Sequence, residues 1–340
     1  MNSLLMLAFC FTGPNASRDA PASAPPKVHK IAVGGEGGWD YLTVDPEARR
    51  LYVSRGARVV VLDLEKEAVA GELADTPGVH GIAIVPELGK GFTSNGRDSS
   101  VTVFDLKTLK PTGKIKANGT PDAILYDAAS KRVITFNHRT NDGTSIDPAT
   151  EKVAGTIDFK GEPEAAVADG KGHIFVNIRS SSEVVEFDAL SLEILHRWPL
   201  APGVRPNGLA LDAKNRRLFS GCNGNSKMVV MDADKGTVIA TVDIGKGSDG
   251  CGFDPVKGLA YSSNGRTGDL TVIDESEPGK FHVVATIPTQ ASARTMTIDP
   301  KTHRVYLPAA TQAPAASGAQ KQGGRRGMVP DSFVIIVVEP

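Results

Sequence analysis

The chain has 340 residues, of which 40% are hydrophobic and 23% charged, and its formal net charge is −1 at pH 7. A protein that binds mainly through a phosphate backbone carries a basic excess, so nucleic acid is not expected as a partner. Its 36 glycines and 22 prolines favour a fold with many short strands and tight turns.

The first 26 residues differ in composition from the rest. An apolar run from Leu4 to Phe11 is too short to span a bilayer, and an Ala-, Ser- and Pro-rich stretch follows it. This pattern predicts a signal-peptide remnant and a disordered tether, and therefore an exported protein in the periplasm or at the cell surface. Cys10 resembles a lipid-anchoring cleavage site, although Phe9 is large for the preceding position and the basic start of a signal is missing. The alternative is an ordinary disordered N-terminus.

From residue 27 onward one pattern recurs seven times. A short apolar run is followed by an Asp turn and then by a second run. The first runs begin at Leu42, Ile82, Ile124, Ala166, Leu209, Cys251 and Met296. The turn residues are Asp45, Val85, Asp127, Asp169, Asp212, Asp254 and Asp299. Because an Asp side chain can accept hydrogen bonds from the backbone just downstream, each pair of runs is predicted to form a β-hairpin.

Each hairpin is followed by further apolar runs. The third runs include VVVLDL, VTVFDL and VVMDA, and the fourth runs include AVAGELA and HVVATIPT. Four antiparallel strands in each repeat of about 40–45 residues are typical of a propeller blade. The sequence therefore predicts an all-β, seven-bladed β-propeller.

The seventh repeat predicts how the ring closes. A Gly-, Ala- and Pro-rich loop over residues 309–331 precedes a third strand at Ser332–Val338, and no fourth run remains. A matching run lies at Lys27–Val33, so the N-terminal strand is expected to complete the last blade and make residues 27–340 one domain. The loop is predicted to be flexible. Its Lys321, Arg325 and Arg326 suggest a basic lid, the alternative being an idle insertion.

The repeat units resemble those of the YncE-like, YVTN-repeat family of bacterial β-propellers. The resemblance rests on HRVYLP, RRLYVS and RRLFSG, combined with third strands such as VVVLDL and VTVFDL, and it covers roughly residues 28 to 340. It implies an exported seven-bladed propeller that acts in binding or at the cell surface. It supplies no catalytic motif.

Polar residues stand where one mouth of the channel is expected. First strands of a propeller lie innermost, and second strands return to the same end. The residues two places before the first runs are Asp40, His80, Asp122, Glu164, Asn207, Asp249 and Arg294. The second runs end near Arg55, Arg97, His138, Arg139, Arg179, Asn223 and Arg266. We predict that these residues bind a small molecule or peptide: arginines favour an anion and carboxylates a cation. The alternative is a water-filled channel lined by mutually paired charges.

A metal site is a narrower hypothesis. Glu164, Asn207 and Asp249 stand on successive blades and offer oxygen ligands suited to a cation such as Ca²⁺. RPNGLALD and SDGCGFD also resemble metal-binding strands of gluconolactonase-type propellers, which have six blades. The rival to a non-catalytic scaffold is thus a metal-dependent, lactonase-like hydrolase with Asp122 as base. Zinc is not expected, since His80 and His138 have no Cys or His at ligand spacing.

The remaining predictions concern catalysis, cysteines and assembly. The sequence contains no nucleophile elbow, phosphate-binding loop or dinucleotide fingerprint, so no catalytic residue is assigned. Cys222 and Cys251 are expected near the same mouth on adjacent blades, either as a disulfide or as two buried thiols. The protein is expected to be a monomer without a transmembrane segment.

Overall fold

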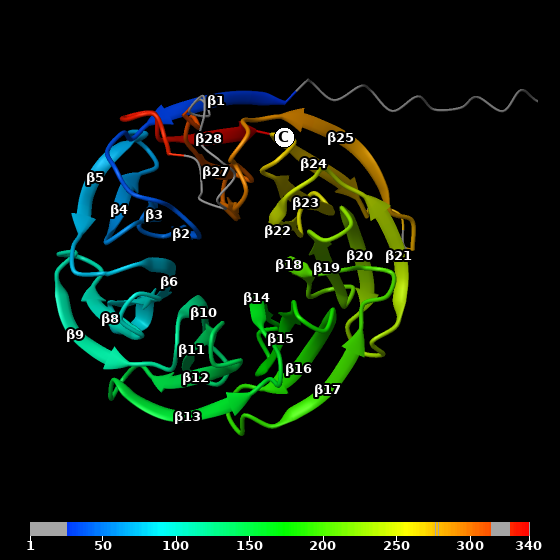
Figure 1. Cartoon of the computed structure of the whole chain (residues 1–340), viewed down its shortest axis with the longest axis horizontal. Coiled ribbons are helices and arrows are strands. Elements are labelled where there is room, and N and C mark those ends of the chain that lie inside the picture. The colour runs from blue at the N-terminus through cyan, green and yellow to red at the C-terminus, as the bar shows by residue number, and fades with distance from the viewer. Residues whose placement is uncertain (1–25, 276, 278, 314–326, 340) are drawn as a thin grey trace, which may run out of the picture.

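The computed structural model describes residues 26–275, 277, 279–313 and 327–339. The predicted signal remnant with Cys10 and the proposed lid residues Lys321, Arg325 and Arg326 lie outside these ranges. The described strands form seven four-stranded antiparallel sheets arranged as blades around a central axis (Figure 1). The predicted seven-bladed propeller is therefore confirmed. None of the described residues forms a helix with the length and apolar character needed to cross a membrane.

Blades one to six are simple meanders in which the first strand lies innermost and the fourth outermost (Figure 1). Blade one contains β2 (Leu42–Asp45), β3 (Arg50–Arg55), β4 (Arg58–Asp63) and β5 (Ala68–Leu73). Blade two contains β6 (Val79–Val85), β7 (Lys90–Asn95), β8 (Ser100–Asp105) and β9 (Pro111–Lys116). Blade three contains β10 (Pro121–Asp127), β11 (Arg132–Asn137), β12 (Asp142–Asp147) and β13 (Lys152–Asp158). Blade four contains β14 (Pro163–Ala168), β15 (His173–Ile178), β16 (Glu183–Asp188) and β17 (Ile194–Pro199). Blade five contains β18 (Pro206–Asp212), β19 (Arg217–Cys222), β20 (Lys227–Asp232) and β21 (Val238–Asp243). Blade six contains β22 (Ser248–Asp254), β23 (Leu259–Asn264), β24 (Asp269–Asp274) and β25 (His282–Pro288).

The turn aspartates close the inner hairpins as expected. Asp212 Oδ1, for example, accepts hydrogen bonds from the backbone N–H groups of Lys214 and Asn215 at 2.9 and 3.2 Å. Buried turn aspartates also join neighbouring blades, as Asp299 of blade seven does through an ion pair of 2.7 Å with Arg49 of blade one. Where Val85 replaces the aspartate, the turn is instead a short 3₁₀ helix at Pro86–Leu88.

Blade seven combines both ends of the chain. It consists of β26 (Thr297–Ile298), β27 (Val305–Ala309), β28 (Val334–Glu339) and β1 (Lys27–Ala32). β1 pairs antiparallel with β28, so that Ile31 lies opposite Ile335. The predicted closure by the N-terminal strand is thus confirmed, and it covers the edge that β28 would otherwise expose.

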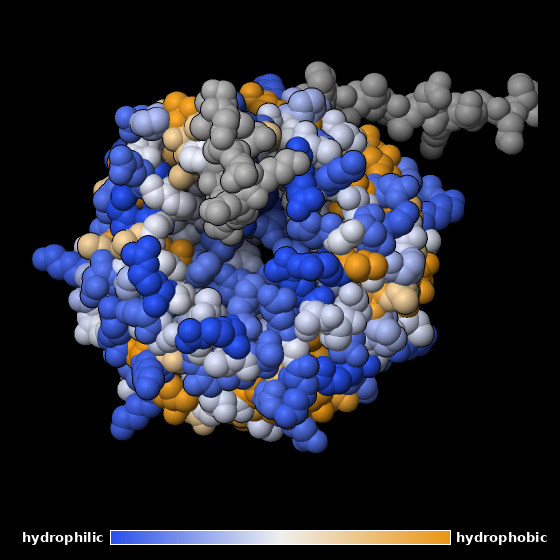
Figure 2. Space-filling view, viewed as in Figure 1, coloured by the Kyte–Doolittle hydropathy of each residue, from blue (hydrophilic) through white to orange (hydrophobic). Residues whose placement is uncertain are grey.

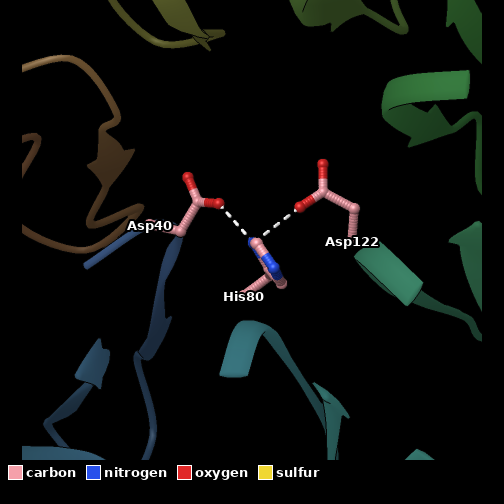
Figure 3. A group of neighbouring side chains, drawn as sticks. All are labelled: Asp40, His80 and Asp122. Carbon is pink, nitrogen blue, oxygen red and sulfur yellow. Dashed lines mark hydrogen bonds and ion pairs between the residues drawn. The ribbon is translucent and has the colours of Figure 1, made fainter. Parts of the chain in front are cut away.

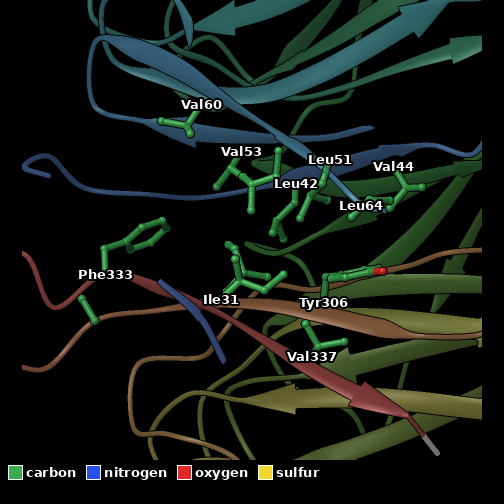
Figure 4. Close-up of a cluster of buried hydrophobic side chains, with 13 residues drawn as sticks. Ile31, Leu42, Val44, Leu51, Val53, Val60, Leu64, Tyr306, Phe333 and Val337 are labelled. Atoms are coloured by element: carbon green, nitrogen blue, oxygen red, sulfur yellow. The ribbon is translucent and has the colours of Figure 1, made fainter. Parts of the chain in front are cut away.

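A hydrophobic cluster between blades seven and one holds this closure together (Figure 4). Ile31 is the one fully buried residue of β1, and it packs in the same cluster as Leu42 and Val53 of blade one and Phe333 of blade seven. The aromatic rings of Trp39 and Phe333 add a tilted contact at 5.3 Å between centroids. Both ends of the chain therefore share one core with the first blade.

Candidate functional site at the mouth of the central channel

The inner strands carry a recurrent β-bulge where they begin. In blade three, Pro121 pairs with Asn137 and Ile124 with Thr135, so β10 has one residue more than β11 over this stretch. The same shift occurs at the start of β6, β14, β18 and β22. A bulge bends the strand and redirects the side chain of its extra residue. In these blades it falls at the position predicted to face the channel mouth.

Small polar side chains of the second strands stabilise these irregular starts. The hydroxyl of Ser94 on β7 accepts a hydrogen bond from the N–H of Gly81 at 2.8 Å and donates one to the carbonyl of Asp122 in the next blade. Asn177 donates likewise to the carbonyls of Asn207 and Gly208, both at 3.0 Å. Since buried backbone groups must be hydrogen-bonded, these side chains fix the position of the mouth residues from blade to blade.

Three side chains from blades one to three form the first part of a ring around the axis (Figure 3). The Nδ1 atom of His80 lies 2.7 Å from Asp40 Oδ2 and 2.8 Å from Asp122 Oδ1. One imidazole nitrogen is therefore shared by two carboxylates. Burial alone would lower the pKa of His80, but its contacts with Asp122 and Asp40 outweigh burial and raise that pKa to about 10.

The ring continues through blades three and four. The Nε2 atom of His138, just after β11, lies 3.3 Å from Asp122 Oδ2 and 3.4 Å from Glu164 Oε1. Glu164 also forms an ion pair of 2.8 Å with Arg179. Burial lowers the pKa of His138, whereas Glu164 and Asp122 raise it, and the result is a pKa of about 9. Burial raises the pKa of Glu164 itself.

Blades five to seven return the ring to its start. Asn207 donates a hydrogen bond of 2.7 Å to Asp249 Oδ1, and Asp249 Oδ2 pairs with Arg294 at 2.8 Å. Arg294 then reaches Asp40 Oδ1 at 3.3 Å. The predicted metal candidates Asn207 and Asp249 thus contact each other, and the second oxygen of Asp249 is taken by a guanidinium. The structure does not place Glu164 in contact with either of them.

The charges of this ring balance when both histidines are protonated. The four inner carboxylates (Asp40, Asp122, Glu164, Asp249) face two guanidinium groups (Arg179, Arg294), which leaves a charge of −2 that two imidazolium ions cancel. Outside this inner set, the more exposed Glu162 lies 3.9 Å from His138 and 3.8 Å from Arg179. The carboxylates are mostly buried, with exposed fractions of 6% for Asp122 and 4% for Glu164. Such a network is stable only when its members are paired, as they are here.

Tyr41, which sequence reasoning did not identify, partly fills the channel. The positions that follow the ring residues are Tyr41, Gly81, Ala123, Ala165, Gly208, Gly250 and Thr295. The Tyr41 side chain extends from blade one and packs against a core cluster of blades three and four that includes Ala123. Burial and the charges of Asp122 and Glu164 raise the pKa of Tyr41 well above its ordinary value. A cavity of about 160 Å³ lies beside it, lined mainly by the small residues of the inner strands.

Exposed arginines surround this ring on the same face. Arg97, Arg139 and Arg266 follow the second strands of blades two, three and six and are solvent-exposed. Figure 2, which looks down the channel, shows hydrophilic side chains gathered around the central hollow. Gly78 and Gly247 adopt φ values of +69° and +80° and approach the backbones of Arg97 and Arg266 so closely that a Cβ atom would lie within about 3 Å of them. The inter-blade loops therefore support these turns directly.

The other two predicted mouth residues have different environments. Asn223 is half-buried just after β19, and its backbone N–H donates to the carbonyl of Arg205 at 3.1 Å. Arg55 is not brought to the ring. Its side chain is 1% exposed, donates to the carbonyls of Gly34 and Gly35 and stacks over Phe333 at 3.8 Å. This guanidinium therefore organises the loop between β1 and β2.

The structure places Cys222 and Cys251 as two separate thiols, as in the second of the two alternatives. The Sγ atom of Cys251 lies where a Cβ on Gly221 would point, 2.6 Å from that position. Cys222 follows Gly221 on β19, so its side chain points to the opposite face of the sheet, where its Sγ packs near Gly203. Burial raises the pKa of Cys222 to about 11 and that of Cys251 to about 12.

A second, larger cavity of about 580 Å³ lies at the opposite end of blades seven and one. Its lining includes Glu67 and Glu339, which pair with Arg304 at 3.3 and 2.6 Å, and Arg49, which pairs with Glu65 at 2.7 Å. The charged groups that line it are thus largely satisfied by each other.

Comparison with solved structures shows the fold of the chain. The structure of U3-55K aligns with a TM-score of 0.75 at 8% identity over 92% of this chain and 98% of that chain. The RRP9 WD40 repeats align with a TM-score of 0.76 at 8% identity, covering 92% and 97%. A chain of the mitotic checkpoint complex gives 0.74 at 14% identity, covering 98% of both. No family model and no curated protein sequence matches the chain. At these identities the likeness establishes the propeller architecture alone.

Proposed function

We propose that this protein is a non-catalytic, exported binding propeller of the YncE-like, YVTN-repeat type, which binds a small anionic molecule or acidic peptide at the channel mouth. One observation carries the proposal: exposed arginines from three blades surround a ring whose own charges are already paired. Arg97, Arg139 and Arg266 would therefore both form the binding site and favour an anionic ligand.

The two sets of arginines differ in what they contact. Arg179 and Arg294 of the ring are engaged with carboxylates at 2.8 Å. Within the described ranges, by contrast, the guanidinium groups of Arg97, Arg139 and Arg266 make no ion pair. A free guanidinium binds a carboxylate or phosphate through two parallel hydrogen bonds. A ligand that spans the mouth could contact several of these arginines together.

A binding role also agrees with the state of the ring. Each of its four carboxylates has a hydrogen-bond or ion-pair partner within the ring, so none is left as a free general base above the channel. Export is supported by the composition of the first 26 residues and by the resemblance to the YVTN-repeat family.

The proposal is tested with two triple variants of equal charge. The mouth variant replaces Arg97, Arg139 and Arg266 with Ala. The control variant replaces Lys107, Lys214 and Lys235 with Ala; these three lysines are exposed in turns at the opposite end of the blades. Binding of citrate and of a fluorescein-labelled hexaglutamate peptide is measured by titration at 0.15 M salt.

At roughly 1 kcal/mol for each exposed guanidinium, the mouth variant is expected to bind about 100-fold more weakly than the unmodified protein. The control should retain the original affinity. An equal loss in both variants would show that binding follows net charge, and it would refute a site at the mouth.

A further inference from the structure

One group in the ring combines two carboxylates and an imidazole at close range. Asp122 Oδ2, His138 Nε2 and Glu164 Oε1 come from β10, the turn after β11, and β14. Within the described part of the chain, ligand atoms of these three residues lie within 4.8 Å of one another. Asp122 and Glu164 are almost completely buried, whereas His138 is partly accessible from the mouth. The three ligand atoms are therefore held together just beneath the mouth, and only the outer part of the His138 ring faces solvent.

The spacing in this group differs from that around His80. The distances of 2.7 and 2.8 Å at His80 Nδ1 are hydrogen-bond lengths, which indicates a proton shared with carboxylates. The corresponding distances at His138 Nε2 are 3.3 and 3.4 Å, and this buried nitrogen has no hydrogen-bond partner in the described structure. Metal–ligand bonds of about 2.0–2.1 Å in tetrahedral geometry would place ligand atoms roughly 3.3 Å apart. The two distances at His138 Nε2 thus match the separation of neighbouring ligands in a coordination shell.

A second unsatisfied atom lies in the same ring. Asn207 is 5% exposed, and its amide oxygen has no hydrogen-bond partner in the described structure. Its amide nitrogen is turned toward Asp249 in blade six, so the oxygen points away from that blade. A buried amide oxygen without a donor carries a free-energy cost unless a further group occupies the ring.

We propose that Asp122, His138 and Glu164 bind one first-row divalent transition-metal ion, such as Zn²⁺ or Mn²⁺. Two carboxylate oxygens and an imidazole nitrogen suit these ions, whereas Ca²⁺ and Mg²⁺ prefer oxygen alone. Two neighbouring side chains hold these ligands in place: His80 lies 2.8 Å from the other oxygen of Asp122, and Arg179 donates to Glu164 Oε1 itself at 2.8 Å, which leaves that oxygen a second lone pair for the ion. Such outer contacts orient metal ligands.

This site goes beyond the proposed anion binding and does not depend on it. The proposed ligands Asp122, His138 and Glu164 differ from the sequence-based candidates Glu164, Asn207 and Asp249. Only Glu164 belongs to both sets. The ion would lie in the floor of the mouth, inside the circle of exposed arginines. Loss of Arg97, Arg139 and Arg266 is accordingly expected to leave metal binding intact, so the two proposals can fail separately.

The test uses the full chain without an affinity tag. EDTA first removes bound metal from the protein, and the EDTA is then removed before the titration. Zn²⁺ is titrated by calorimetry, and Mn²⁺ is titrated by electron paramagnetic resonance of the free ion. One ion per chain is expected, with no comparable binding of Ca²⁺ or Mg²⁺. Glu164→Gln should weaken Zn²⁺ and Mn²⁺ binding at least about 100-fold, because it removes the negative charge of a residue that binds the ion directly. The loss of a residue that only orients a ligand costs about 10- to 100-fold in affinity.

Matched variants locate the ion. Asp249→Asn changes another buried acid of the same ring outside the ligand set, and it should bind the metal as the unmodified protein does. His138→Ala, at a partly exposed position, repeats the test if Glu164→Gln does not fold. His173 and His196 both contact Glu186, at 2.9 and 3.1 Å, and form the alternative histidine–carboxylate group. Absence of binding, retention of affinity in Glu164→Gln and His138→Ala, or a loss caused by His196→Ala would each overturn the proposal.

Discussion

Closure of the ring by β1 makes a quantitative prediction for Ile31. This side chain is 4% exposed in the cluster that joins blades seven and one, whereas Val28 on the same strand is 42% exposed. Replacing a buried Ile with Ala removes transfer free energy and leaves a cavity, at a cost of about 2–5 kcal/mol. We therefore expect Ile31→Ala to lower the free energy of unfolding by about 3 kcal/mol, and Val28→Ala by less than about 0.5 kcal/mol.

The measurement is equilibrium unfolding in urea. Tryptophan fluorescence is a suitable probe, since Trp39 packs on Phe333 in the same cluster. Deletion of residues 27–34 should destabilise the protein further, because it exposes the edge of β28, while removal of residues 1–25 should leave the midpoint unchanged. If Ile31→Ala and Val28→Ala lowered the unfolding free energy equally, β1 would not be a structural part of the last blade.

Three further predictions follow from single contacts. A folded-state pKa raised to about 10 means that the contribution of His80 to stability is fully present below pH 6.5 and is lost as pH rises toward 10. Unfolding free energies across this range should fall more steeply in the unmodified protein than in His80→Gln, which keeps only the similar contribution of His138 with its pKa of about 9. Thiol titration of the denatured, unreduced full chain should find three reactive thiols, those of Cys10, Cys222 and Cys251, and a count of one would restore the disulfide. Ser94→Ala should cost about 1–3 kcal/mol by leaving the N–H of a bulge unsatisfied, and a change within 0.3 kcal/mol in urea unfolding would contradict that role.

The architecture was predictable because it repeats. Each blade restates the same hairpin with its turn aspartate, and a strand missing at one end of the chain could be matched with a spare strand at the other. Val85 shows the tolerance of the pattern, since a 3₁₀ turn at Pro86–Leu88 replaces the aspartate turn without loss of the blade. Local backbone chemistry was therefore sufficient to define the fold.

The site was predictable in position but only partly in its contacts. Sequence alignment of the repeats places Asp122 at the mouth. Its contact with His80 joins two neighbouring blades and its contact with His138 joins two strands of blade three, and no local spacing reveals either contact. Arg55 was misplaced because the carbonyl groups of Gly34 and Gly35 accept hydrogen bonds from its guanidinium and hold it beneath the loop between β1 and β2. Tyr41 left one usable signal, a bulky residue where other repeats have Gly, Ala or Thr.

The most direct test of the central claim is an arginine footprint of the bound state. Phenylglyoxal modification is followed by peptide mass spectrometry with and without saturating citrate or hexaglutamate. A ligand at the mouth should protect Arg97, Arg139 and Arg266, while half-exposed Arg132 at the far end of β11 should react at an unchanged rate. Equal modification of the three mouth arginines in both states, or protection of Arg132 instead, would contradict binding at the channel mouth.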